Sequence, residues 1–163
     1  MLTCFFEDGE KAKGGLRHVT VDAIAVNEKN EVLLVKRAAH LFHPNLFTVP
    51  GGFLDRDETT AKGVLRELQE ETGYTGEIIS LFQINDNPQR PKEDRQTVDF
   101  VYIVHITGGQ IQINSEVSEI SWFGKKDLPE DEEFAFDHRA AIMKYFEYKE
   151  KPFALPLIGE MQV

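Results

Sequence analysis

The order of residue patterns along the chain predicts an α/β fold. Short segments rich in β-branched residues stand on both sides of one helix-length segment, residues 52–74, in which apolar residues recur at helical spacing. A second helix-length segment follows the later strands, beginning near Phe136. This order fits an α/β/α sandwich around a mixed β-sheet. Periodicity alone establishes only the α/β class.

The composition is that of one globular domain, and we expect residues 1–163 to form it. Of the 163 residues, 41% are hydrophobic and 28% are charged. The net charge of −10 argues against nucleic acid or an anionic membrane as a partner, since both attract Lys and Arg. It would also repel a polyphosphate substrate unless metal ions neutralise the phosphates.

Cysteine content and the amino-terminal residues bear on the compartment. Cys4 is the one cysteine, so neither an internal disulfide nor a cysteine-based zinc site can form. The first 15 residues lack the features of a signal peptide, and no apolar run reaches the roughly 20 residues of a membrane span. We expect a cytoplasmic protein.

The segments before residue 52 predict strands joined by short loops. A β-branched run and a second apolar run flank a polar turn, which predicts a hairpin. A loop carrying His40 and His43 follows, and then a short strand leads into Gly51 and Gly52, where a backbone without side chains can approach a ligand closely. The expected elements are strand 17–26, turn 27–30, strand 31–37, loop 38–45 and strand 47–50.

Residues 52–74 predict an amphipathic helix with readable ends. Asp57 or Thr59 can serve as the N-cap, and Gly73 stands where a left-handed residue would end the helix. The expected buried stripe consists of Ala61, Val64, Leu65 and Leu68.

Three glutamates form a second face of this helix. Glu67, Glu70 and Glu71 lie roughly 120° round from the apolar stripe. Like charges at this spacing weaken a helix. The pattern by itself leaves two interpretations open: a solvated charged face, or a site whose oxygen ligands bind Mg²⁺ or Mn²⁺.

The spacing of the whole segment decides between them. Gly52, Glu58 and the run from Arg66 to Tyr74 resemble the Nudix box, G-x5-E-x7-R-E-U-x-E-E-x-G-U, at every fixed position, with only Tyr74 departing from an aliphatic residue. The resemblance implies the Nudix fold over residues 17–148 and a catalytic set of Arg66, Glu67, Glu70, Glu71 and Glu116. It implies metal ligation by the three box glutamates and the carbonyl of Gly51. Arg66 is expected to organise the box glutamates, and Glu119 is the second candidate after Glu116.

The segments after the helix complete the expected fold. A loop with three basic residues, Arg90, Lys92 and Arg95, separates two strands, of which the second is apolar enough to be central. Gly108 and Gly109 predict a turn that pairs residues 110–114 with that strand as a hairpin. The expected elements are strand 77–84, loop 85–96, strand 97–107, a short strand after Glu116, a helix capped by Asp137, and an apolar tail, 151–163, that covers the sheet or a partner subunit.

The resemblance also implies a reaction, the hydrolysis of a nucleoside diphosphate linked to another group. Pro88 and the segment 134–138 resemble the ADP-ribose pyrophosphatase branch, which favours ADP-ribose cleaved to AMP and ribose 5-phosphate. The alternatives are a nucleoside triphosphate pyrophosphohydrolase, including one acting on oxidised dGTP, and a non-catalytic ADP-ribose sensor. The candidate substrate contacts are Arg37, Phe47, Arg90 and Arg95. A homodimer is a further expectation.

Overall fold

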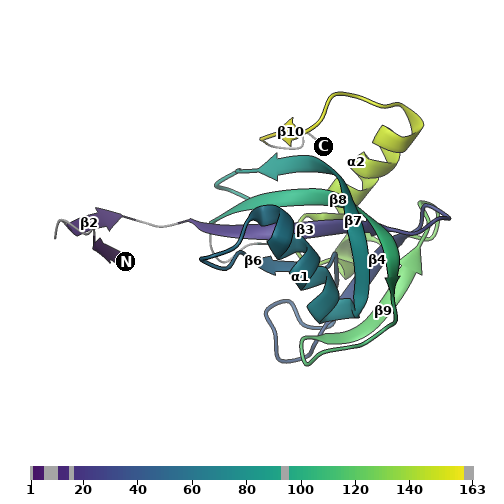
Figure 1. Cartoon of the computed structure of the whole chain (residues 1–163), viewed down its shortest axis with the longest axis horizontal. Coiled ribbons are helices and arrows are strands. Elements are labelled where there is room, and N and C mark those ends of the chain that lie inside the picture. The colour runs from purple at the N-terminus through teal and green to yellow at the C-terminus, as the bar shows by residue number, and fades with distance from the viewer. Residues whose placement is uncertain (1, 6–10, 15–16, 93–95, 160–163) are drawn as a thin grey trace.

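The fold is a β-sheet with one helix on each face. The computed structural model describes residues 2–5, 11–14, 17–92 and 96–159. Figure 1 shows α1 (Thr60–Thr72) on one face of the main sheet and α2 (His138–Glu150) on the other. The strands of the main sheet are β3 (His18–Val26), β4 (Val32–Arg37), β5 (Phe47–Thr48), β6 (Gly51–Phe53), β7 (Tyr74–Asn85), β8 (Thr97–Gly109), β9 (Val117–Phe123) and β10 (Leu157–Ile158).

Strand pairing in the main sheet is mixed. The order is β10-β7-β8-β3-β4-β5, with β6 paired to β3 and β9 paired to β4. β3 and β8 run parallel along their full contact, whereas β7 and β8 are antiparallel. β8 is therefore an interior strand, which confirms its predicted central place. Two further strands, β1 (Leu2–Phe5) and β2 (Lys11–Gly14), form a separate antiparallel pair.

Alternation along β3 builds a core on each side of the sheet. Val21 and Ala23 are fully buried against the α1 side, where Val64 and Leu68 of α1 are also fully buried. Ile24, the residue after Ala23, faces the opposite core together with residues of α2. The apolar stripe of α1 thus packs against the inward-facing residues of β3, as the sequence predicts. The predicted α/β/α sandwich is confirmed.

Local sequence determines both ends of α1. The Thr59 side chain accepts a hydrogen bond from the backbone N–H of Lys62, which makes Thr59 the N-cap. Gly73 ends the helix at φ 76°, where its N–H donates to the carbonyl of Gln69. A Cβ at this glycine would lie 2.3 Å from the carbonyl oxygen of Gln110, so the close approach of that segment also requires glycine.

The predicted hairpin at residues 110–114 is wrong. β8 continues to Gly109 at φ 89°, and residues 110–114 form no strand. Instead the N–H of Gln112 donates to the carbonyl of Thr72, so the segment covers the carboxyl end of α1. Ile111 and Ile113 are about half exposed, because no neighbouring strand covers them.

The hairpin predicted for residues 17–37 forms only next to its turn. Val26 pairs with Val32, after which β4 leaves β3 and pairs with β9 and β5. The space beside β3 is taken by β6, which places Gly51 opposite Asp22.

The carboxyl-terminal tail covers part of the sheet, which is one of the two roles predicted for it. β10 adds to β7 in parallel, with Leu157 opposite Gln83. Phe153, Leu155 and Leu157 pack against the core on the α2 side. Between the tail and β9, η1 (Asp131–Glu133) is a short 3-10 helix that precedes α2.

Candidate active site

The acidic face of α1 lies against the two glycines of β6. Glu71 is buried, with 7% of its surface exposed, and one carboxylate oxygen accepts a hydrogen bond from the N–H of Gly51 at 3.1 Å. Burial raises the pKa of Glu71 to about 8, and the charges of Glu67 and Glu116 add to this rise against the opposing Gly51 hydrogen bond. The ionised form of this carboxylate is therefore costly without a compensating positive charge.

Glu67 lies directly over Gly52. A Cβ at that glycine would be 2.6 Å from Oε1 of Glu67, so any side chain there would displace the carboxylate. Burial raises the pKa of Glu67, while its contact with Arg66 acts in the opposite direction. Glycine is thus required at position 52 because the carboxylate of Glu67 lies directly above it. The sequence does not show this contact.

Arg66 connects three carboxylates of the box. Its Nε and Nη2 donate to the two oxygens of Glu58 at 3.1 and 2.6 Å. Its Nη1 donates to Glu67 at 2.8 Å and to Glu70 at 3.0 Å. The guanidinium therefore orients two of the predicted metal ligands and anchors them to Glu58 at the start of the helix.

The donor atoms of the site suit a hard divalent cation. Glu67, Glu70 and Glu71 offer carboxylate oxygens, and β6 brings the backbone of Gly51 beside them. Within residues 17–92 and 96–159, no three His, Cys, Asp or Glu side chains converge closely enough to hold a metal ion as they stand. Arg66 donates to one oxygen of Glu67 and to one of Glu70. Oxygen donors of this kind fit a divalent metal ion by chemistry.

A pocket of about 150 Å³ opens next to these carboxylates, and Gly51 and Gly52 form part of its wall. The other lining residues come from β3, β4, β5, β6, β8, the first residue of α2 and the loops that precede β5, β8 and α2, so the pocket lies on the α2 side of β3. They are Thr20, Asp22, Arg37, Phe42, Thr48, Phe53, Arg90, Thr97, Phe136 and His138.

Buried polar residues form the floor of the pocket. Nε2 of His138 lies 3.1 Å from Oδ2 of Asp22, and its Nδ1 lies 2.6 Å from Oγ1 of Thr48. Burial would raise the pKa of Asp22, but the neighbouring His138 holds it below its usual value. Burial and the charge of Asp22 raise the pKa of adjacent Asp99 well above its usual value.

No motif in the sequence gives a role to Asp22 or His138. One signal was available for Asp22, an aspartate within the otherwise apolar run from Val21 to Val26. A buried strand tolerates an ionisable residue only if it has partners.

The predicted substrate contacts occupy different environments. Arg37 lines the pocket, where its Nε donates to the carbonyl of Phe42 and its guanidinium lies 5.4 Å from the Phe136 ring. Phe47 does not line it: this ring is 7% exposed and packs in the core against Phe123 and Phe134, so we assign it a structural role.

The basic residues of the loop before β8 bind acidic residues and carbonyls of the protein itself. Arg90 borders the pocket but is 8% exposed, and it binds Asp137 through two hydrogen bonds while also donating to Thr97. Lys92 binds Asp131 and the carbonyl of Phe134. Arg95 lies outside the described residues. Asp137 precedes α2, as predicted, but its carboxylate binds Arg90 and Asn85 and does not cap the helix.

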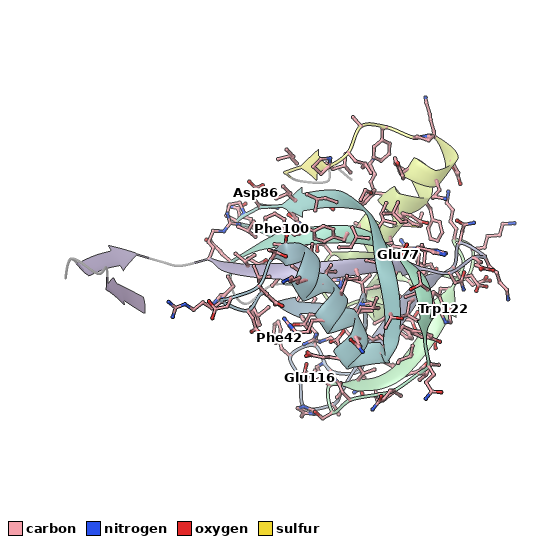
Figure 2. All side chains as sticks on the ribbon, viewed as in Figure 1. Phe42, Glu77, Asp86, Phe100, Glu116 and Trp122 are labelled. Atoms are coloured by element: carbon pink, nitrogen blue, oxygen red, sulfur yellow. The ribbon has the colours of Figure 1, made fainter. Side chains whose placement is uncertain are left out.

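Glu116 stands just before β9, and its charge reaches the site. In the view of Figure 2, Glu116 and Phe42 both lie below α1, and the N–H of Ala38 donates to the Glu116 carbonyl. The charge of Glu116 acts on Arg37, Glu67 and Glu71. Glu119 instead lies 3.7 Å from Lys36 across β4 and β9.

An α/β/α sandwich with a glutamate-bearing helix over a glycine pair defines a class of phosphoanhydride hydrolases, and comparisons with known proteins support this class. The family model of the NUDIX domain matches residues 16–145. A protein of Methanocaldococcus jannaschii named ADP-ribose pyrophosphatase is 33% identical over 131 residues, which are 80% of this chain and 74% of that protein. The chain belongs to the Nudix family and is a pyrophosphohydrolase.

Solved structures agree with this fold. A NUDIX hydrolase from Nitrosomonas europaea aligns with a TM-score of 0.79 at 22% identity, covering 98% of this chain and 93% of that one. The NUDIX domain of Shewanella oneidensis NrtR, crystallised with ADP ribose, aligns with a TM-score of 0.65 at 28% identity, covering 83% of this chain and 90% of that one. Nudix hydrolases generally use divalent metal ions.

The structure also bears on membrane association. None of the helices in the described part of the chain is long and apolar enough to cross a membrane. The cytoplasmic location stays a prediction.

Proposed function

We propose that this Nudix hydrolase cleaves ADP-ribose to AMP and ribose 5-phosphate. The observation that supports it most is the arrangement at β6: Gly51 bonds to the box carboxylate Glu71 and also lines the pocket, so a substrate ring in the pocket would bring its diphosphate to the box. The similarity to the Methanocaldococcus protein across 80% of this chain supports the same substrate.

The box glutamates Glu67, Glu70 and Glu71, with the carbonyl of Gly51, hold Mg²⁺ or Mn²⁺ in this proposal. Carboxylate and carbonyl oxygens are the ligands that these ions prefer. Burial of Glu71 gives a physical reason for a cation at this place, because a cation offsets the cost of ionising it. When bound, a divalent cation lowers the pKa of the attacking water and neutralises the diphosphate.

The protein's own groups position and deprotonate the reactants. Arg66 fixes the rotamers of Glu67 and Glu70 through its hydrogen bonds. Arg37 contacts the diphosphate from the pocket side. Glu116 or a box glutamate accepts the proton of the water that attacks phosphorus. One phosphorus–oxygen bond forms to the water oxygen, and the bridging phosphoanhydride bond breaks to release two monophosphates.

Product analysis with purified protein tests the proposal. The protein is incubated with Mg²⁺ or Mn²⁺ and, separately, with ADP-ribose, dinucleotides and nucleoside triphosphates, with a chelator as the control. AMP and ribose 5-phosphate from ADP-ribose are the expected products. Pyrophosphate released from triphosphates alone would favour the sanitising alternative, and binding of ADP-ribose without turnover would favour the sensor.

Two broader expectations stay proposals. We propose that residues 1–163 act as one domain and that two copies associate. Light scattering at several protein concentrations tests the second point, and a mass equal to the 18.6 kDa chain throughout would contradict it.

A further inference from the structure

We propose that a small cavity behind the floor of the pocket binds one water molecule, held between the side chains of Gln83 and Asp99. The site is separate from the box carboxylates and from the pocket itself. It does not depend on the proposed substrate, because it is built from buried residues of the sheet and of α2.

The cavity lies between the sheet and the start of α2. Gln83 belongs to β7 and Asp99 to β8, and Ala141 of α2 forms part of the opposite wall. The volume of the cavity is about 10 Å³. This is close to the lower limit of about 10–15 Å³ at which a buried cavity holds one water molecule. A second water or a larger ligand does not fit.

Two buried polar atoms of the cavity residues have no hydrogen-bond partner within the described ranges. They are Nε2 of Gln83 and Oδ2 of Asp99, and each of these residues is 1% exposed. Buried polar atoms in folded proteins nearly always have a partner, either in the protein or in an ordered water. Only two other buried side-chain atoms in the described part of the chain share this condition, so half of them belong to this one cavity.

The contacts of Asp99 leave one of its oxygens open to a further partner. Its Oδ1 accepts a hydrogen bond from Oγ1 of Thr20 at 3.1 Å. Nη1 of Arg90 lies 3.5 Å from Oδ2, whereas charge-assisted hydrogen bonds between such groups are about 2.7–2.9 Å long. A bound water would therefore supply the hydrogen bond that the ion pair with Arg90 does not make.

The chemistry of the two atoms selects water over an ion. The amide Nε2 of Gln83 is a donor and needs an acceptor, and the carboxylate oxygen of Asp99 is an acceptor in its ionised form. A metal cation cannot accept the amide hydrogen. A chloride ion cannot donate to a carboxylate, and the nearby charge of Asp22 would repel it. Water donates and accepts, so it also serves Asp99 when that oxygen carries a proton.

The water site supports the pocket floor from behind. Asp22, Arg90 and His138 line both the cavity and the pocket, so they form the wall between the two. Thr20, which also lines the pocket, donates to the carboxylate of Asp99. A water bonded to Asp99 therefore fixes the second oxygen of the carboxylate that receives this hydrogen bond.

A high-resolution crystal structure of the full-length wild-type protein tests the assignment directly. We expect a density maximum about 2.5–3.2 Å from both Nε2 of Gln83 and Oδ2 of Asp99. The proposal is overturned if that position holds no density. It is also overturned if the contacts are roughly 2.4 Å long, because such distances identify a metal ion.

Magnetic relaxation dispersion of water oxygen-17 tests the same site in solution, because it counts water molecules that exchange slowly with the solvent. Gln83→Met keeps a side chain of similar length but removes the amide, so we expect one slowly exchanging water fewer than in wild type. Gln110→Met makes the same substitution at an exposed glutamine and should keep the wild-type number.

Equal numbers of slowly exchanging waters in wild type and Gln83→Met would contradict the proposal, and so would an equal loss in both variants. The crystal measurement needs no variant, so it decides the question even if Gln83→Met does not fold.

Discussion

Replacement of Glu71 by glutamine separates the stability of the site from its chemistry. The carboxylate is 7% exposed, and its one direct hydrogen bond comes from the N–H of Gly51, which a glutamine carbonyl can also accept. The variant therefore removes a buried charge while keeping the shape and the hydrogen bond. We expect metal-free Glu71→Gln protein to be more stable than wild type at pH 8 and turnover to fall at least about 100-fold.

The size of the stability gain follows from the pKa. Burial raises the pKa of Glu71 from 4.5 to about 8, so the folded protein keeps a proton that the unfolded chain has lost. Stability is therefore full below about pH 4.5 and falls as the pH rises to about 8. At about 1.4 kcal/mol per pH unit the loss approaches 5 kcal/mol. Burial of the glutamine amide offsets part of it, which leaves a gain of about 2–5 kcal/mol.

Thermal unfolding in the presence of a chelator measures this gain. For a chain of this length, about 2–5 kcal/mol raises Tm by roughly 5–15 °C at pH 8, and the difference should nearly vanish at pH 5. Glu70→Gln is the matched control, because it makes the same substitution at a box glutamate whose side chain is 57% exposed. A Glu71→Gln protein no more stable than wild type at pH 8 would refute the reasoning.

Addition of Mg²⁺ or Mn²⁺ should narrow the difference in stability between the two proteins. A ligand that binds only the folded state stabilises it by about 2.7 kcal/mol at 100 times its Kd. Wild type should gain this stabilisation, and Glu71→Gln should lose most of it. Equal metal-induced shifts in both proteins would remove Glu71 from the ligand set.

Two further substitutions test the cations of the site. Arg66→Lys keeps the charge, but a lysine cannot bind Glu58 with two hydrogen bonds while also reaching Glu67 and Glu70. We expect the fold to persist and kcat/KM, measured against metal concentration, to fall about 10- to 100-fold. An unchanged metal dependence would contradict the positioning role of Arg66. Arg90→Gln leaves the carboxylates of Asp99 and Asp137 without their buried cation. We therefore expect urea unfolding to show a free energy of unfolding lower by about 3–5 kcal/mol. Unchanged stability with a raised KM would instead support the substrate contact that the sequence predicted for Arg90.

Local sequence determined the box helix. Thr59, Gly73 and the apolar stripe act within a few residues of one another, and the spacing of the glutamates follows from helical geometry. The helix therefore appears where the pattern predicts it, and the family and the reaction class follow from the same segment. The strands also follow from local pattern, since β-branched runs and alternation are properties of neighbouring residues.

Predictions that depended on distant contacts were less accurate. Residues 110–114 alternate between polar and apolar residues like a strand, yet Gln112 bonds to the carboxyl end of α1 and not to a neighbouring strand. Phe47 was expected to contact substrate, but Phe123 and Phe134, both more than 75 residues later, enclose its ring. Arg90 was expected to contact substrate, but it binds Asp137 in the interior.

By itself the sequence determined the helix, its caps, the carboxylates and hence the chemistry, because each depends on residues close together in the chain. The tertiary structure alone decided the pocket. Asp22 comes from β3, Arg37 from β4, Phe42 from a loop, Phe136 from the segment before α2 and His138 from the start of α2, so more than 110 residues separate its first and last members. Sheet pairing and helix packing bring these residues beside Gly51, and no local spacing records that arrangement.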